Sequence, residues 1–248
     1  MKIAVCVSLV PDSTTKVKLS NDKLKIDENG VTFIINPYDE FAVEEAVQLK
    51  EKHGGEVIAV SFGTIKSKDA IKKAYQMGAD KGIFVEASGD FDSFTAAKNL
   101  AETIKDLNAD IIFFGKQSID YDSSVIPAMV GEILNLPYIN VVTKLDIDGT
   151  IIRVEREIEG GKEILESTMP VIIGAQKGLN NPRYPNLRSI MASKSKPVEE
   201  KKASYTGNIT EVTEMSLPAI KGTGKILKNG VSDVPELVKL LREEAKVI

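Results

Sequence analysis

The chain has 248 residues, of which 42% are hydrophobic and 27% are charged, as in a globular protein with a sizeable core. Its formal net charge of −4 excludes the broad basic field that nucleic-acid binding usually requires. No apolar run approaches the ~18 residues of a membrane span, and the first strand is expected almost at Met1, which leaves no room for a signal peptide. The single cysteine fits a reducing compartment. We therefore expect a cytoplasmic protein that neither binds nucleic acid nor inserts into a membrane.

The single histidine, His53, removes several classes of active site. It precedes Gly54 and Gly55 at the expected end of a helix, where an imidazole complements the helix dipole. A zinc site would need further ligands that the chain lacks. No Ser-His-Asp or Cys-His pair can be assembled from a base at a helix terminus. We therefore predict neither a metal site nor catalytic residues in this chain.

Up to Ile139, short apolar runs rich in β-branched residues alternate with stretches of helical periodicity. Strands are predicted at residues 3–7, 56–62, 82–86 and 111–114. Helices are predicted at about 39–53, 67–77, 92–107 and 124–135, with Ser67 capping the second and Ser123 or Ser124 the fourth. This order predicts a doubly wound, mainly parallel sheet, the α/β architecture of Rossmann-like proteins that bind adenine nucleotides.

Two regions depart from this alternation. Residues 16–19 and 23–26 alternate between apolar and polar side chains on either side of Asn21-Asp22, which predicts an exposed hairpin. After Ile139, further strands are predicted at residues 140–147, 151–157, 162–167 and 171–173. These strands would form an appendage that partly extends the main sheet.

The chain becomes polar beyond Tyr184. Residues 194–202 are rich in lysine and glutamate and contain Pro197, a composition typical of a solvated linker. A last amphipathic helix is predicted at about residues 232–246. Its apolar face consists of Val234, Leu237, Leu240 and Leu241. That face would dock either on the chain's own core or on a partner.

Ligands of open parallel sheets bind beyond the carboxyl ends of the strands, where the strand order reverses. In a flavodoxin-like order the first and fourth strands lie side by side there, so residues 8–12 and 115–124 form the two candidate loops. The second loop offers a glycine, a lysine, hydroxyls and the N-terminus of a helix, which together suit a phosphate. Asp120 and Asp122 argue against a bare phosphate cradle, but they could bind a ribose hydroxyl or cap the helix.

More specific nucleotide-binding motifs are absent from the sequence. Gly115-Lys116 is not a Walker motif, because the earlier glycine is missing and Gln117 stands where serine or threonine is needed. No G-x-G-x-x-G follows the first strand. The residues alone therefore leave two alternatives open. The loop either binds a nucleotide or is an ordinary polar strand-to-helix loop, and Asp120 and Asp122 either perform acid–base chemistry or are simply solvated.

Six groups of residues, in the same order and spacing, resemble the β subunit of electron transfer flavoprotein. They are Val7-Ser8-Leu9-Val10-Pro11-Asp12; Asn36-Pro37-Tyr38-Asp39 with Ala42-Val43-Glu44-Glu45-Ala46; Met77-Gly78-Ala79-Asp80; Gly115-Lys116-Gln117-Ser118-Ile119-Asp120; Val154-Glu155-Arg156-Glu157 with Gly160-Gly161; and Asn181-Pro182-Arg183-Tyr184. Together they cover about residues 1–200. The resemblance departs from the family signature at Gly174, where another small residue is usual.

The resemblance implies a heterodimer that carries electrons. The α subunit would hold the redox FAD, and this chain would hold an AMP that has no redox role. Electrons would pass from a dehydrogenase to the FAD and on to a quinone-linked or other acceptor. Glu157 would help to seat the FAD domain of the partner, and Leu187 would be the anchor that dehydrogenases grip.

The resemblance also implies which residues contact the cofactor in this chain. They are Cys6, Val7, Ser8, Asn36, Pro37, Tyr38, Asp39, Phe62, Gly63, Gly115, Gln117, Ser118, Ile119, Asp120, Asp122, Ser123, Ser124 and Val125. Two departures from the family affect this set. Ser8 replaces a frequent lysine, and residues 123–127 replace a run rich in hydroxyls and amides.

Three rival functions follow from the same residues. Some relatives bind a second FAD in place of AMP and bifurcate electrons, but the Gly-Asp-Thr run that they usually carry in this loop is absent, which favours AMP. An adenylating or ATP-hydrolysing enzyme would need a pyrophosphate loop after the first strand, which residues 8–12 do not provide. A stand-alone nucleotide sensor would not need the tail after Tyr184.

We divide the chain into two parts. Residues 1–185 would form a nucleotide-binding α/β domain. Residues 186–248 would form a recognition loop, a linker and a C-terminal arm with terminal helix, which together make an extended partner-binding tail.

Overall fold

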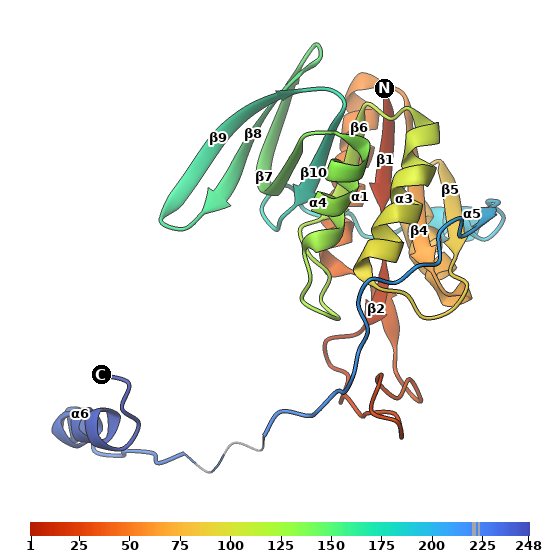
Figure 1. The fold of residues 1–248 in the computed structure, drawn as a ribbon. Coiled ribbons are helices and arrows are strands. Elements are labelled where there is room, and N and C mark those ends of the chain that lie inside the picture. The colour runs from red at the N-terminus through yellow and green to blue at the C-terminus, as the bar shows by residue number, and fades with distance from the viewer. Residues whose placement is uncertain (220–221, 223) are drawn as a thin grey trace.

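A sheet of nine strands runs through the part of the chain that the structure describes, residues 1–219, 222 and 224–248. In this computed structural model the strands are β1 (Lys2–Cys6), β4 (Glu56–Gly63), β5 (Lys81–Glu86), β6 (Ile111–Gly115), β7 (Tyr138–Asp148), β8 (Ile151–Ile158), β9 (Gly161–Thr168), β10 (Val171–Ala175) and β11 (Glu199–Lys202). Their order across the sheet is β11-β5-β4-β1-β6-β10-β7-β8-β9 (Figure 1). β7, β8 and β9 pair antiparallel, and the other neighbours pair parallel.

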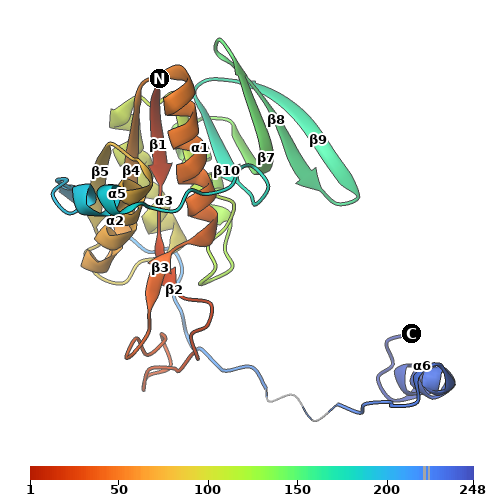
Figure 2. The same cartoon turned by 180° about the vertical axis from the view of Figure 1, so that it is seen from behind.

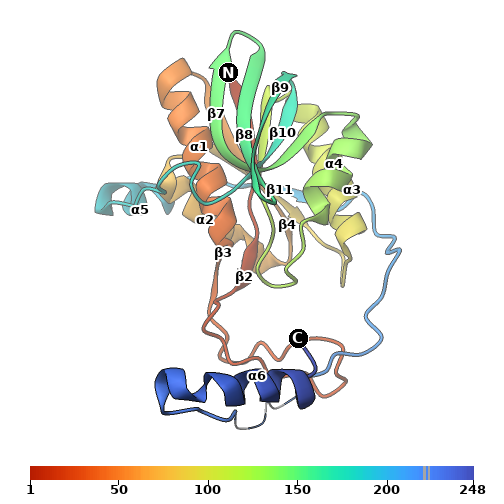
Figure 3. The ribbon, with the colours of Figure 1, turned by 90° about the vertical axis from the view of Figure 1, so that its left-hand side faces the viewer.

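Helices cover both faces of this sheet. The helices in the described part of the chain are α1 (Pro37–His53), α2 (Lys68–Met77), α3 (Ser93–Leu107), α4 (Val125–Leu134), α5 (Leu187–Ser193) and α6 (Val234–Glu243), and the last of these does not cover the sheet. Figure 2 shows α1 and α2 on one face, and Figure 3 shows the sheet edge-on with α3 and α4 on the opposite face. A short antiparallel pair, β2 (Leu9–Pro11) and β3 (Phe33–Ile35), lies beyond the end of β1.

The predicted α/β architecture is confirmed. The first four parallel strands lie in the order β5-β4-β1-β6, which is the order of the classic dinucleotide-binding fold and not the flavodoxin-like order. β1 and β6, the first and fourth parallel strands along the chain, are nevertheless neighbours, as expected. The predicted appendage is also confirmed, because β10 and β7 continue the parallel sheet while β8 and β9 extend it as a hairpin.

The core consists of two layers, one on each face of the sheet. On β1, Ile3 and Val5 face the layer under α1 and α2, whereas Ala4 and Cys6 face the layer under α3. All four side chains are buried. A strand covered on both faces needs apolar residues at every position, and this explains why the parallel strands are continuous apolar runs in the sequence.

The exposed hairpin predicted at residues 16–26 is only partly formed. An isolated antiparallel bridge joins Leu19 to Ile26, and the backbone hydrogen bonds from Ser20 to Lys25 and from Asp27 to Lys18, each 2.8 Å, flank it, but no two-stranded ladder develops. Val17 and Leu24 are exposed, so no apolar layer stabilises the pairing, and a two-stranded hairpin alone is marginal in water. Side chains also compete for the backbone, because the Asp22 carboxylate accepts a hydrogen bond from the Leu24 amide at 3.1 Å.

The solvated linker predicted at residues 194–202 is wrong. Four of these residues form β11, which pairs with β5 as the outer strand of the sheet. Two contacts bring the chain to this edge. Lys196 Nζ donates to the carbonyl of Ala79 at 2.7 Å, and the Tyr75 hydroxyl donates to the carbonyl of Pro197 at 2.6 Å. A charged composition does not exclude a strand at this position, since edge strands commonly carry charged side chains.

The two predicted serine caps are not formed. Ser67 and Ser124 stand at the N-cap positions of α2 and α4, but neither side chain caps the helix. The turn of 3₁₀ helix at Ile65–Ser67 gives Ser67 a helical backbone (φ −62°, ψ −15°), whereas a side-chain cap needs an extended one. Asp92, which has that extended backbone, does cap α3 by accepting from the Thr95 amide at 2.8 Å.

After β11 the chain runs along α3, held by side chains of that helix. The side-chain oxygen Oδ1 of Asn99 accepts from the backbone amides of Ser204 (2.9 Å) and Tyr205 (3.2 Å), and its Nδ2 donates to the backbone carbonyl of Tyr205 at 2.8 Å. Asp92 accepts from the amides of Ile209 (2.8 Å) and Thr210 (2.9 Å). These bonds fix residues 204–210, the first part of the C-terminal arm.

The predicted terminal helix is confirmed as α6. It lies apart from the sheet and from the helices that cover it (Figure 1, Figure 3). Val234 and Leu237 on its apolar face are 48% and 44% exposed, so the chain's own core does not cover that face. No helix in the described part of the chain is both long and apolar enough to cross a membrane.

Asn99→Ala should release the first part of the C-terminal arm. Its loss would leave partly buried backbone groups of Ser204 and Tyr205 without their partners, at a cost of about 1–2 kcal/mol in the free energy of unfolding. Urea unfolding measures this change, and limited proteolysis should show faster cleavage within residues 203–212. Lys105→Ala on the exposed side of the same helix is the control. Equal unfolding midpoints for Asn99→Ala and the control would contradict the assignment.

Candidate functional site

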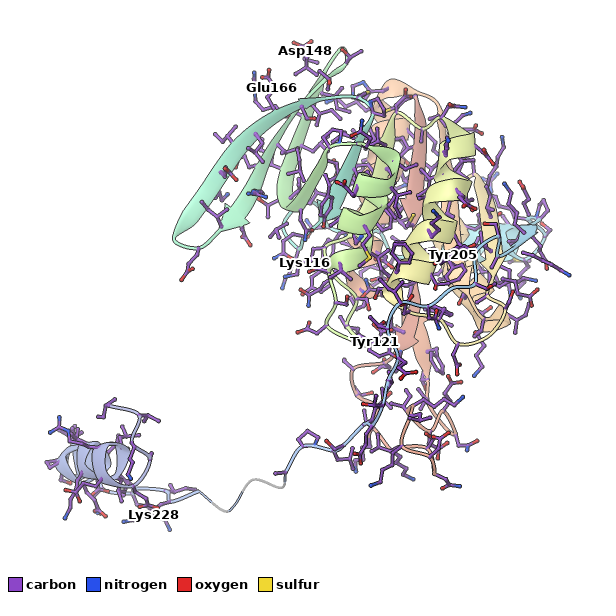
Figure 4. The ribbon with its side chains drawn as sticks, viewed as in Figure 1. Lys116, Tyr121, Asp148, Glu166, Tyr205 and Lys228 are labelled. Carbon is purple, nitrogen blue, oxygen red and sulfur yellow. The ribbon has the colours of Figure 1, made fainter. Side chains whose placement is uncertain are left out.

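The loops at the carboxyl ends of β1, β4 and β6 gather at one end of the sheet. Figure 4 shows Lys116 and Tyr121 at this end, and Asp148 at the tip of the hairpin toward the opposite end. Because the strands are parallel, every loop after a strand opens at the same end. The two candidate loops of the sequence, residues 8–12 and 115–124, therefore lie together as predicted, and the start of α1 lies with them.

Asp39, in the first turn of α1, joins these loops through its carboxylate. Oδ2 accepts from both the backbone amide and the hydroxyl of Ser8, each at 2.8 Å. Oδ1 accepts from Asn36 Nδ2 at 2.8 Å and from the Gly115 amide at 3.1 Å. The side chain is buried, and burial raises the pKa of Asp39 to about 6, although the four donors work in the opposite direction. One side chain thus holds the ends of β1 and β6 and the start of α1.

Gly115 is required by this contact with α1. A Cβ at Gly115 would lie 2.4 Å from Asp39 Oδ1 and 2.7 Å from Tyr38 Cβ, both too close for a side chain. The glycine at position 115 was expected to let the backbone approach a phosphate. Its close contact with Asp39 and Tyr38 explains it without a ligand.

Residues 117–123 form a loop closed by its own hydrogen bonds. The Ser118 amide donates to the carbonyl of Ser123 at 2.9 Å. The side chains of Gln117 and Ser118 donate to the carboxylates of Asp122 and Asp120. The two aspartates therefore act within the loop, and they do not cap α4. Among the described residues, no three His, Cys, Asp or Glu side chains cluster so as to hold a metal ion.

The helix that follows this loop begins with free donors. In the described structure neither Ser123 nor Ser124 uses its hydroxyl in a hydrogen bond, and no side chain caps α4. The first amides of a helix lack intrahelical partners, so those of Val125 and Ile126 are available to a ligand. Pro127 has no backbone N–H and is buried, which leaves the donors at the very start of the helix.

Asn36 presents the one buried acceptor of these loops that is left without a partner. Its Nδ2 donates to Asp39 and to the carbonyl of Gln117 at 2.9 Å, whereas its Oδ1 has no partner in the described structure. Asn36 is 1% exposed. A buried carbonyl oxygen without a donor is costly, so this atom is suited to a ligand that brings one.

The remaining predicted residues line the same end less directly. Phe62 lies next to the last residue of β4 and packs edge-to-face on Phe91, with ring centroids 4.8 Å apart. Burial, and to a lesser degree the charge of Asp39, raises the pKa of the Cys6 thiol, so this cysteine is no thiolate nucleophile. Lys116, which the predicted contact set did not include, places Nζ 4.9 Å from the centre of the Tyr38 ring.

Comparison with known proteins identifies the family of this chain. Residues 23–206 match the electron transfer flavoprotein domain. The electron transfer flavoprotein subunit beta of Syntrophomonas wolfei is 42% identical over 96% of this chain and 92% of its own length. That of Bacillus subtilis is 39% identical over 94% and 95%, and the mitochondrial one of Arabidopsis thaliana is 37% identical over the whole of both chains. The chain belongs to the electron transfer flavoprotein β-subunit family.

Membership of the electron transfer flavoprotein family makes this chain part of an electron carrier associated with a flavin, and a β subunit implies an α-subunit partner. Of the residues predicted to meet that partner and the dehydrogenases, Glu157 lies toward the same end of the sheet, because it contacts Gln176, which follows β10 where that strand pairs with β6. Glu157, near the end of β8, is exposed and accepts from Gln176 Nε2 at 3.3 Å. Leu187 begins α5 and is 74% exposed. Figure 2 shows α5 beside α2, on the side of the sheet away from β8 and β9.

Arg183 was not predicted to have a role, yet it fixes the segment that precedes Leu187. Its guanidinium donates to Glu44 at 2.8 Å and to Glu51 at 2.7 Å, and its backbone amide also donates to Glu44, at 3.0 Å. Glu44 is buried on α1, and a buried carboxylate needs a basic partner, but no pattern in the sequence links it to Arg183.

Asp39→Asn should change how the stability of the protein depends on pH. Since burial raises the pKa of Asp39 to about 6, the folded chain binds this proton more tightly than the unfolded chain does. The stability contributed by the proton is fully present below about pH 4 and is lost as the pH rises through 6. The free energy of unfolding of the wild type minus that of the variant should therefore fall by roughly 1.4 kcal/mol between pH 5 and 7.5. Urea titrations at the two pH values measure this difference, and parallel profiles would contradict it.

Proposed function

We propose that this chain is the β subunit of a heterodimeric electron transfer flavoprotein in which it binds AMP and supports the FAD of the α subunit. Electrons would pass from a dehydrogenase to that FAD and on to a quinone-linked acceptor. The observation that carries the AMP site is the combination, at one end of the sheet, of free donors at the start of α4 and the unpartnered Oδ1 of Asn36. FAD supplies the redox chemistry when bound, whereas the residues of this chain bind AMP and support the FAD of the α subunit.

The donors at the start of α4 suit the phosphate of AMP. The amides of Val125 and Ile126 and the hydroxyls of Ser123 and Ser124 are free, and the helix dipole adds a partial positive charge. A phosphate dianion accepts hydrogen bonds and donates none, so this donor set matches it. Lys116, whose ammonium makes no ion pair in the described structure, lies on the same loop and can offset the carboxylates of Asp120 and Asp122.

The acceptor Oδ1 of Asn36 suits the nucleoside part. An amide oxygen needs a donor, which AMP provides in its adenine amino group and ribose hydroxyls but not in its ionised phosphate. The pattern of donors and the acceptor therefore orients AMP across the end of β1, with its phosphate toward α4.

An ATP-using enzyme would need backbone donors for a pyrophosphate after β1. The amide and hydroxyl of Ser8, the first residue after β1 and Val7, are already bound to Asp39, so Ser8 has no donor to offer there. This supports AMP over a polyphosphate substrate. The free thiol of Cys6 supports a reducing, cytoplasmic location.

The contacts of the heterodimer would come from residues outside this site. We place residues 1–185 in the nucleotide-binding domain, and we assign residues 186–248 to partner recognition. The exposed apolar face of α6 fits burial against the α subunit, and the exposed Glu157 fits a cationic group of its FAD domain. Leu187 offers dehydrogenases an exposed apolar anchor at the start of α5.

The complex co-purified with its α subunit should contain about one FAD and one AMP per heterodimer. Flavin absorbance counts the FAD, and chromatography of the heat-released nucleotides identifies AMP. Two flavins per heterodimer would instead establish the bifurcating type with FAD in the site of this chain. ATP turnover by the chain would establish the enzyme alternative.

Leu187→Ala should weaken docking of the electron donor without disturbing the cofactors. Truncating an exposed apolar anchor at an interface commonly costs about 2 kcal/mol, so the KM of a partner dehydrogenase for the complex should rise about tenfold or more. Steady-state reduction of the complex measures this, with its FAD and AMP contents as checks. Ile164→Ala, which removes an exposed apolar side chain from β9, is the matched control. The same KM for both variants would exclude Leu187 as the anchor.

A further inference from the structure

The carboxylate of Asp39 has no capacity left for a ligand. Each of its oxygens already accepts two hydrogen bonds, from Ser8 on one side and from Asn36 and Gly115 on the other. A carboxylate offers about four acceptor sites. Asp39 is also 5% exposed. It therefore acts on a nucleotide through the groups that it holds and not by contact.

The group through which Asp39 acts is the side-chain amide of Asn36. The two partners of that amide, the Asp39 carboxylate and the carbonyl of Gln117, are both acceptors. The nitrogen must face them, so the oxygen is forced to the other side, where it has no partner. The chemistry of the neighbours thus fixes which way this amide points.

We infer that Asp39 is a positioning residue of the AMP site: it holds Asn36 with its oxygen turned to accept a hydrogen bond from the nucleoside. The inference rests on the proposed AMP site and deepens it. It moves Asp39, Ser8 and Gly115 from the predicted contact set to a supporting network. Asn36 remains as the contact that this network presents.

The same network directs the phosphate away from β1. The backbone amide of Ser8 follows the first strand, where a dinucleotide-binding fold offers donors to phosphate, but it is bound to Asp39, as is the amide of Gly115. A phosphate at that point would lie beside a buried carboxylate of like charge. The free donors at the start of α4 are then the ones available to it.

The test compares nucleotide binding by the heterodimer, stripped of AMP, in wild-type form and as Asp39→Asn. The probes are AMP and adenosine, which lacks the phosphate. An asparagine at position 39 can turn its own NH₂ toward Asn36, so the Asn36 amide loses its fixed orientation. The dissociation constants of both probes should rise about tenfold or more and by similar factors. Glu40→Gln is the matched control, because this neighbouring acid on α1 faces Lys73 and not the loops; its constants should match the wild type.

Three results would overturn the inference while AMP binding stands. They are unchanged binding by Asp39→Asn, tighter binding, and a change confined to AMP, since the last two would mean that Asp39 acts on the phosphate by charge. Failure of the wild type to bind AMP would instead overturn the proposed function itself.

A double-mutant cycle separates positioning from a general structural role. Asn36→Ala should weaken both probes, and Asp39→Asn added to it should cause no further loss, because the group that Asp39 positions is already gone. Additive losses would contradict the inference. Should Asp39→Asn fail to assemble with the α subunit, Ser8→Ala takes its place in the cycle. It removes one donor to the carboxylate and should weaken both probes about threefold, again only while Asn36 is present.

Discussion

The carboxylate of Asp39 is the interaction on which the ligand end of this sheet depends. A parallel sheet ends in loops whose backbone groups have left the strand ladder and need new partners. Asp39 satisfies two such amides, those of Ser8 and Gly115, from a single position. That position is fixed by the core, because Ala42 and Ala46 of the same helix are fully buried against the sheet. Packing of α1 is thereby transmitted to the loops that would meet a nucleotide.

The same device, a polar side chain on a core-packed helix that binds backbone groups, fixes the irregular segments elsewhere. Asn99 and Asp92 on α3 hold the first part of the C-terminal arm, and Glu44 on α1 holds the amide of Arg183 before α5. These segments bury little apolar surface of their own. Their direction is nevertheless set by the helices, so the surfaces proposed to meet partners are positioned by the same core as the proposed nucleotide site.

The sequence was sufficient for the layers of the fold and for the end of the sheet where a ligand would bind. Strands buried on both faces are apolar throughout, and amphipathic helices separate them, so their alternation is visible locally. β11 was missed because an edge strand with charged side chains resembles a linker. Within the site, the bonds from Asp39 to Gly115 and from Arg183 to Glu44 join residues 76 and 139 positions apart. No local pattern reveals such pairs.

The network around Asp39 and the loop from Gln117 to Ser123 differ in what a bound nucleotide would do to them. The network around Asp39 is complete within the chain, so AMP would enter a site whose floor is already formed. Apart from the hydrogen bond that the Gln117 carbonyl accepts from Asn36, the loop from Gln117 to Ser123 is closed by its own hydrogen bonds, and Tyr121 at its tip is 70% exposed. Ligand binding stabilises most the parts that lack other support. A nucleotide here would therefore order the start of α4 and its loop, while β1 and α1 keep the geometry that the core imposes on them.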